Sequence, residues 1–82
     1  MSYQEREITK DKLEKHVRVL DTDEGIRIDN QTELIFVNKT SSRYIVDISK
    51  NNLDQFYYLN SLNEVMQFLD DKIKSTSRIF SY

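Results

Sequence analysis

The chain of 82 residues contains no cysteine, proline, tryptophan or alanine, and Gly25 is its only glycine. The lack of cysteine excludes disulfide frameworks, thiol nucleophiles and cysteine-ligated zinc sites, and it favours a reducing compartment. A single glycine excludes a glycine-rich phosphate-binding loop. The longest unbroken apolar run, Leu34–Val37, is far too short to span a membrane. We therefore expect a cytoplasmic protein with no cofactor and no contact with a membrane.

The net charge bears on the partners that the chain can bind, and the residue usage bears on its source. Twelve basic and fourteen acidic residues give a net charge of −2, which counts against a nucleic-acid binder because such proteins usually have a basic excess. The codons of the missing alanine and proline are GC-rich, whereas those of the plentiful isoleucine, asparagine, lysine and tyrosine are AT-rich. This usage indicates an AT-rich coding genome, such as that of a low-GC bacterium, its phages or plasmids, or an AT-rich virus. The charged N-terminal segment lacks the apolar core of a secretory signal, so secretion is not expected.

The clearest element is an amphipathic helix from Ser61 to Ser75. Ser61 followed three residues later by Glu64 forms a capping box at its start. Apolar residues then recur at steps of three and four, which places them on one face of a helix. That face consists of Leu62, Val65, Met66, Leu69 and Ile73. Such a stripe requires a flat apolar surface to cover it, so we expect the helix to pack on one face of a sheet.

The rest of the chain predicts a short N-terminal helix and a series of strands. Thr9 is expected to cap a helix over 10–16. A period of two begins at Val17, and the acidic run before Gly25 is typical of a hairpin turn in which the glycine takes a positive φ. Further strands are expected over 33–37, 43–48 and 56–59. The prediction is a single α+β domain over 1–82: a short N-terminal helix, an antiparallel meander of three to five strands, and the C-terminal amphipathic helix packed on one sheet face, with 1–7 and 76–82 loosely held.

No residue pattern indicates catalysis or metal binding. His16 is the only histidine and has no partner in the sequence that would orient it for catalysis, so we interpret it as a surface residue at a helix end. The run Asp21–Gly25 has the wrong spacing for a calcium loop, which needs glycine at position six and glutamate at position twelve. We interpret that run as a turn. An enzyme is not expected.

The second face of the expected sheet is the most informative feature for function. Alternation places on it Arg18, Leu20, Arg27, Asp29, Glu33, Ile35, Val37, Arg43, Ile45 and Asp47. Its middle is apolar and its rim is charged, whereas a simple two-layer domain presents a more polar face to water. Either the N-terminal helix covers it through Ile8 and Leu13, or another protein or a second copy of the chain does. The predicted partner-binding residues are Arg18, Arg27, Ile35, Val37, Arg43 and Ile45.

A nucleic-acid interface is the alternative for the same face. Arg18, Arg27 and Arg43 would contact phosphates, and Tyr57 or Tyr58 would stack on bases. The segment from Arg43 to Ile73, with a strand, a loop, a short strand and an amphipathic helix, is similar to the end of PC4-like single-strand-binding domains, although the basic balance of that family is missing. The order of elements also resembles some small phage-encoded inhibitors of host defence, including certain anti-CRISPR proteins.

These observations lead to two functional hypotheses. The first is a non-enzymatic protein-interaction module, such as a small regulator or inhibitor of a host protein encoded by a phage or mobile element. The second is a single-stranded nucleic-acid-binding domain that uses the arginine-bearing sheet face. The first is favoured because acidic residues are interleaved with the arginines and would repel phosphates.

Overall fold

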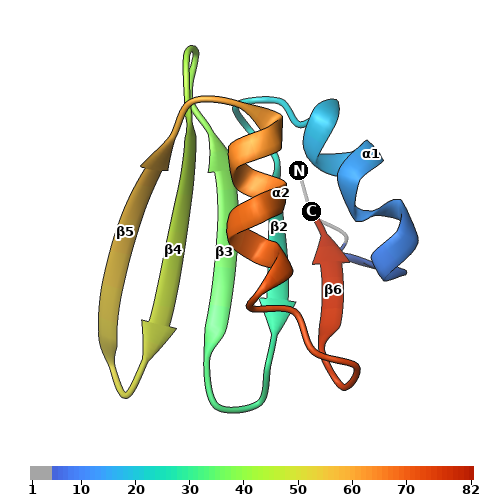
Figure 1. Ribbon diagram of the computed structural model, residues 1–82, viewed down its shortest axis with the longest axis vertical. Helices are drawn as coiled ribbons and strands as arrows, with labels where there is room; N and C mark the ends of the chain where they lie inside the picture. The colour runs from blue at the N-terminus through green and yellow to red at the C-terminus, as the bar shows by residue number, and fades with distance from the viewer. Residues whose placement is uncertain (1–4) are drawn as a thin grey trace.

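The computed structural model describes residues 5–82 and consists of a six-stranded antiparallel sheet with its helices on one face (Figure 1). The strand order is β1-β6-β2-β3-β4-β5, so the last strand in the sequence lies between the first two. The strands are β1 (Arg6–Ile8), β2 (Gly25–Asp29), β3 (Leu34–Lys39), β4 (Tyr44–Lys50), β5 (Leu53–Leu59) and β6 (Arg78–Ser81). The helical segments are η1 (Lys10–Lys12), α1 (Leu13–Arg18) and α2 (Leu62–Asp70).

The predicted fold class, a short N-terminal helix and a C-terminal helix around a meander of three to five strands, is wrong. The described part of the chain is mostly sheet, because β1 and β6 add two strands to the β2–β5 meander. The alternation in Arg78–Ser81 is too short to stand out in a sequence, and these residues, expected to be loosely held, lie in the interior of the sheet. The expected looseness of residues 1–4 lies outside the described residues.

The segment that follows the first helix also differs from its prediction. Val17 belongs to α1 and not to a strand, because Leu13 and Val17 are four residues apart and both pack into the core. Residues 21–24 link α1 to β2, so they do not form a hairpin, and Gly25 has no positive φ. Among residues 5–82, the left-handed positions are Gln31, Asn51 and Asn52, with φ values of 72°, 53° and 64°. Asn51 and Asn52 form the two-residue turn between β4 and β5, where a type I′ conformation needs two positive φ values.

The capped start of α2 is confirmed, whereas its predicted end is not. The Glu64 backbone N–H donates to Ser61 Oγ over 3.2 Å, as the capping box predicts. The helix ends at Asp70, five residues before the predicted end. The chain beyond it is held by Asn30, whose amide donates to the Lys72 carbonyl over 2.9 Å and whose oxygen accepts from the Ser77 hydroxyl. Asn30 is buried and links the β2–β3 turn to the loop that leads into β6.

The core fills the layer between the sheet and the two α-helices. Val65 and Leu69 from α2 and Leu13 and Val17 from α1 are fully buried there. The sheet contributes one side chain in every two, as a two-residue period requires. These sheet residues are Ile26, Ile28, Ile35, Val37, Tyr44, Val46, Ile48 and Ile79. The Tyr44 hydroxyl donates to the Val17 carbonyl and joins β4 to the end of α1.

Candidate functional site: the open face of the sheet

The sheet face opposite the helices, here called the open face, carries the other half of the strand side chains. Both helices pack on the other side, since α1 and α2 contribute to the same buried cluster. Leu13 is buried in that cluster, so the N-terminal helix does not cover the second face of the sheet as one alternative expected. The open face consists of Glu7, Arg27, Asp29, Leu34, Phe36, Asn38, Ile45, Asp47, Ser49, Asp54, Phe56, Tyr58, Arg78 and Phe80.

One row of side chains crosses the whole open face. Strand pairing places these residues opposite one another in the order Glu7, Phe80, Arg27, Phe36, Asp47 and Phe56. Charged and aromatic residues therefore alternate across all six strands. Cross-strand neighbours are close enough for their side chains to interact. The row is the organising feature of the open face.

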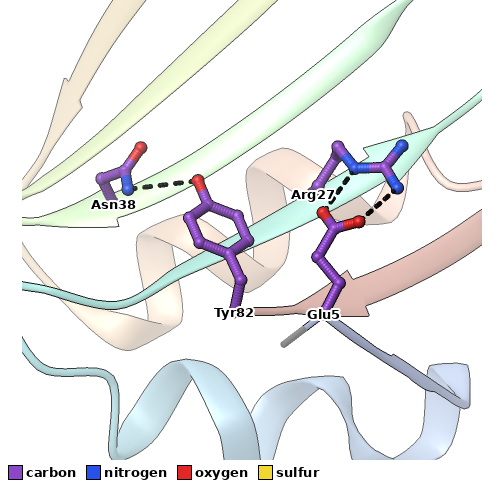
Figure 2. Close-up of polar contacts among 4 residues, drawn as sticks. All are labelled: Glu5, Arg27, Asn38 and Tyr82. Atoms are coloured by element: carbon purple, nitrogen blue, oxygen red, sulfur yellow. Dashed lines mark hydrogen bonds and ion pairs between the residues drawn. The ribbon is translucent and has the colours of Figure 1, made fainter. Parts of the chain in front are cut away.

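Two arginines surround Phe80 at the β1 end of this row. The Arg27 and Arg78 guanidinium carbons lie 4.3 Å and 5.2 Å from the centre of its ring, which is within cation–π range. Arg27 donates to both carboxylate oxygens of Glu5, over 2.8 and 3.0 Å (Figure 2). Arg78 forms the same type of pair with Glu7, over 3.1 and 2.9 Å. Both cations of this cluster are therefore already paired.

The two ion pairs shift the pKa values of their members. The hydrogen bonds from Arg27 hold the pKa of Glu5 below its usual range, and those from Arg78 do the same for the pKa of Glu7. The carboxylates in turn raise the pKa values of both arginines. Each pair stays ionised at neutral pH: Glu5, just before β1, reaches Arg27 of β2, and Glu7 of β1 reaches Arg78 of the neighbouring β6.

Asp47 occupies the middle of the row and has a different environment. It lies between Phe36 and Phe56 on the neighbouring strands. Its Oδ1 atom is buried and has no hydrogen-bond partner among the described residues. Burial raises the pKa of Asp47, and the nearby Asp54 carboxylate raises it further. A buried carboxylate oxygen with no donor is costly, so the charge of Asp47 is held at an energetic penalty in the isolated chain.

On the same face, the start of β2 is in contact with the residue that follows β6. Gly25 and Tyr82 exchange two backbone hydrogen bonds of 3.0 Å, which extend the β2–β6 pairing. The Tyr82 ring lies over Gly25. Its hydroxyl is 3.5 Å from the Asn38 amide nitrogen (Figure 2). The only glycine of the chain is thus used for a close side-chain approach and not for a turn.

The free edge of the sheet at β5 carries most of the large exposed apolar side chains of residues 5–82. Leu53, Phe56 and Tyr58 are 72%, 56% and 59% exposed. In Figure 1, β5 is the outermost strand and α2 lies over the inner strands. A groove of about 630 Å³ therefore remains on the helix side of this edge, between β5 and the residues that follow α2. Its lining includes Leu53, Gln55, Tyr57, Asp71, Lys72 and Lys74.

The structure brings together only part of the predicted partner-binding set. Arg27 and Ile45 lie on the open face. Ile35 and Val37 are completely buried under the helices, so their expected place on the second face is wrong. The alternation of β3 was assigned one residue out of phase, because both faces of Leu34–Val37 are apolar and the sequence could not show which face packs inward. Arg18 is on α1, and Arg43 is in the β3–β4 turn.

The predicted nucleic-acid set is also dispersed. Arg18 pairs with Glu14 on the surface of α1 over 2.7 Å, away from the sheet face. Tyr57 points to the helix side, where its ring lies 4.8 Å from that of Phe68. Arg27 is paired with Glu5, which leaves Tyr58 as the exposed member on the open face. These residues do not form one basic and aromatic surface.

The remaining candidates of the sequence have ordinary structural surroundings. His16 is half-buried on α1. Asp21 and Glu24 accept hydrogen bonds from backbone N–H groups of their own loop, so the acidic run does form a turn between α1 and β2. Within residues 5–82, no group of three histidine, aspartate or glutamate side chains is placed to hold a metal ion.

Sequence reasoning missed Phe36, Phe56 and Phe80, the aromatic residues of the cross-strand row. The signal for Phe56 was present in the strand DQFYYL, where alternation separates Phe56 and Tyr58 from Tyr57. Phe80 could have been found from the alternation of Ile79 and Phe80 near the C-terminus. Which face each set takes depends on the pairing partners, which a single sequence does not show.

No known protein family, curated protein sequence or solved structure matches the chain. No helix within residues 5–82 is long and apolar enough to cross a membrane. Function therefore has to be inferred from the open face itself.

Proposed function

We propose that the protein is a non-enzymatic interaction module that binds a partner protein through the open face. The observation that carries this proposal is the aromatic and acidic centre of the face, where Asp47 lies between Phe36 and Phe56 with a buried oxygen that lacks a donor. Apolar surfaces rimmed by charged residues are typical of protein interfaces.

The charges of the open face indicate the chemistry of the partner. Glu5, which reaches Arg27, and Glu7 are neutralised by the two arginines of the face. Within residues 5–82, no ion pair neutralises Asp29, Asp47 or Asp54. The uncompensated charge is therefore negative. A partner surface that places a guanidinium or ammonium group over Asp47 would neutralise its charge and would also contact the aromatic rings on either side.

The proposed role follows from this chemistry together with the size and residue usage of the chain. A small domain with an acidic and aromatic face is suited to cover a basic surface of another protein. A regulator or inhibitor encoded by a phage or mobile element with an AT-rich genome, acting in the cytoplasm, fits these properties. The same negative charge disfavours a nucleic-acid backbone as the ligand, since phosphates would be repelled.

The test uses a peptide that alternates arginine and leucine, with a matched peptide in which citrulline replaces each arginine. Citrulline keeps the shape of arginine and removes its charge. Backbone amide shifts of the ¹⁵N-labelled protein are followed at low salt. We expect the arginine peptide to shift the signals of the residues around Asp47 and to bind at least about tenfold more tightly than the citrulline peptide, a difference of about 1.4 kcal/mol.

Matched variants distinguish binding at the open face from general electrostatic attraction to the protein. The double variant Asp47→Asn with Asp54→Asn removes two charges from the open face, whereas Asp70→Asn with Asp71→Asn removes two from the end of α2. Only the first pair should abolish the preference for arginine. Equal binding of the two peptides, or equal loss in both double variants, would overturn the proposal.

A further inference from the structure

The two edges of the sheet differ in how well they are protected. The β1 edge has three residues and carries Arg6 and Glu7, and short charged edges resist pairing. The β5 edge has seven residues, contains no proline or lysine, and pairs with β4 without a bulge. Three of the four large exposed apolar side chains of the described chain belong to it. An edge of this kind is open to pairing with another strand.

The turn before β5 determines which backbone groups face outward. Two residues, Asn51 and Asn52, connect Lys50 to Leu53, and the pair that flanks a two-residue turn is hydrogen-bonded. Hydrogen-bonded and non-hydrogen-bonded pairs then alternate along an antiparallel ladder. The N–H and C=O groups of Asp54, Phe56 and Tyr58 therefore point away from β4. They form three equally spaced positions along the free edge, with Phe56 in the middle.

We propose that a second copy of the chain pairs with this edge, β5 against β5 and antiparallel, about a two-fold axis at Phe56. Phe56 of one copy then lies opposite Phe56 of the other and exchanges both backbone hydrogen bonds with it. On the open face Asp54 lies opposite Tyr58, and on the helix side Leu53 lies opposite Leu59 and Gln55 opposite Tyr57. Two-fold interfaces bring the same surface of both copies together, which this strand permits.

The residues of β5 favour its own copy as the occupant. The strand contains a single charged residue, Asp54, and in the proposed register the two Asp54 residues are four positions apart, roughly 13 Å. No like charges are opposed. Leu53, the most exposed large apolar side chain among residues 5–82, gains an apolar neighbour beside the groove that α2 leaves uncovered. The paired sheet would have twelve strands and two open faces side by side, so the dimer adds to the partner-binding face without covering it.

Single cysteine variants test the register, since the chain has no other cysteine. Phe56→Cys places two thiols in directly opposed positions, whose Cα atoms would be about 5.5 Å apart and within disulfide range. Asp54→Cys places them too far apart. Under mild oxidation we expect Phe56→Cys to form a covalent dimer at least tenfold faster than Asp54→Cys. Equal rates would overturn the proposed register.

Sedimentation velocity between about 5 and 500 μM tests the dimer itself, with Phe56→Lys and Phe36→Lys as matched variants. Both change a phenylalanine of the same cross-strand row, but only Phe56 is at the edge. We expect the wild type and Phe36→Lys to form dimers and Phe56→Lys to remain monomeric. A monomeric wild type, or a Phe56→Lys variant that dimerises equally well, would overturn the proposal. No partner is present in these experiments, so their failure is distinct from failure of the proposed partner binding.

Discussion

Tyr82 lies so close above Gly25 that a Cβ atom at position 25 would be 2.4 Å from the Cζ and hydroxyl oxygen of the tyrosine. The same atom would be 2.7 Å from the Asn38 amide nitrogen. Real Cβ contacts are not this short, so any other residue at position 25 must displace the ring. The last residue of the chain and the first residue of β2 are thus fitted to each other.

This contact predicts a coupled effect of two substitutions. We expect Gly25→Ala to lower the free energy of unfolding by roughly 1–3 kcal/mol, as overpacked sites do. With Tyr82→Ala already present, Gly25→Ala should cost much less, because the ring that it would displace is gone. Urea unfolding of the two single variants and the double variant measures this coupling. Strictly additive losses would show that the ring does not occupy this position.

The side-chain hydrogen bonds of Asn30 lead to a second prediction about stability. Its side chain donates to the Lys72 carbonyl and accepts from Ser77, so Asn30→Ala leaves two part-buried polar groups without these partners. We expect a loss of about 1–3 kcal/mol in the free energy of unfolding. Asn63→Ala, at an exposed position of α2, is the control and should change stability by no more than about 0.5 kcal/mol. Similar values for both variants would mean that Asn30 does not hold the loop after α2.

The partly buried environment of Asp47 predicts that its substitution stabilises the isolated protein. Asp47→Asn removes a partly buried charge that repels Asp54, and we expect a gain of about 1 kcal/mol in the free energy of unfolding at pH 7. Burial raises the pKa of Asp47 above its ordinary value of 3.8. A raised carboxyl pKa destabilises the fold above that pKa and has no effect well below 3.8, so the gain should shrink as the pH falls toward 3.

The comparison has to be made between variants at each pH, because other groups act in the opposite direction. The hydrogen bonds from Arg27 lower the pKa of Glu5, so the stabilisation from that pair is lost on acidification in every variant. Asp23→Asn, at an exposed loop position, is the control. A gain for Asp47→Asn that is independent of pH would contradict the proposed role of its charge.

The dispersion of the arginines leads to a prediction about nucleic acids. Arg18 and Arg27 are paired with glutamates and lie on different elements. We therefore expect no salt-dependent binding of single-stranded or duplex oligonucleotides at micromolar concentrations, even at low ionic strength. Fluorescence anisotropy with labelled oligonucleotides measures this. Binding that weakens steeply with salt and disappears when Arg18, Arg27 and Arg43 are all replaced by alanine would contradict it.

The sequence predicted the local features that depend on a few neighbouring residues. The Ser61 cap was identified because its hydrogen bond involves a residue three positions away. Gly25 was assigned to a turn because glycine is usually needed for a positive φ, whereas here a residue 57 positions further along the chain determines its role. The faces of Ile35 and Phe36 were interchanged because the choice depends on which face of β3 the helices cover, and that follows from tertiary packing.

The most direct test of the account compares two isoleucines on opposite faces of the sheet. Ile35 is completely buried under the helices, whereas Ile45 is half-buried on the open face. The urea unfolding of Ile35→Thr and Ile45→Thr measures how much each face contributes to the isolated chain. We expect Ile35→Thr to cost about 2–4 kcal/mol and Ile45→Thr no more than about 1 kcal/mol, because only the first position lies in the closed core. Equally large losses would show that the face assigned to partner binding is itself closed core, and would contradict the account.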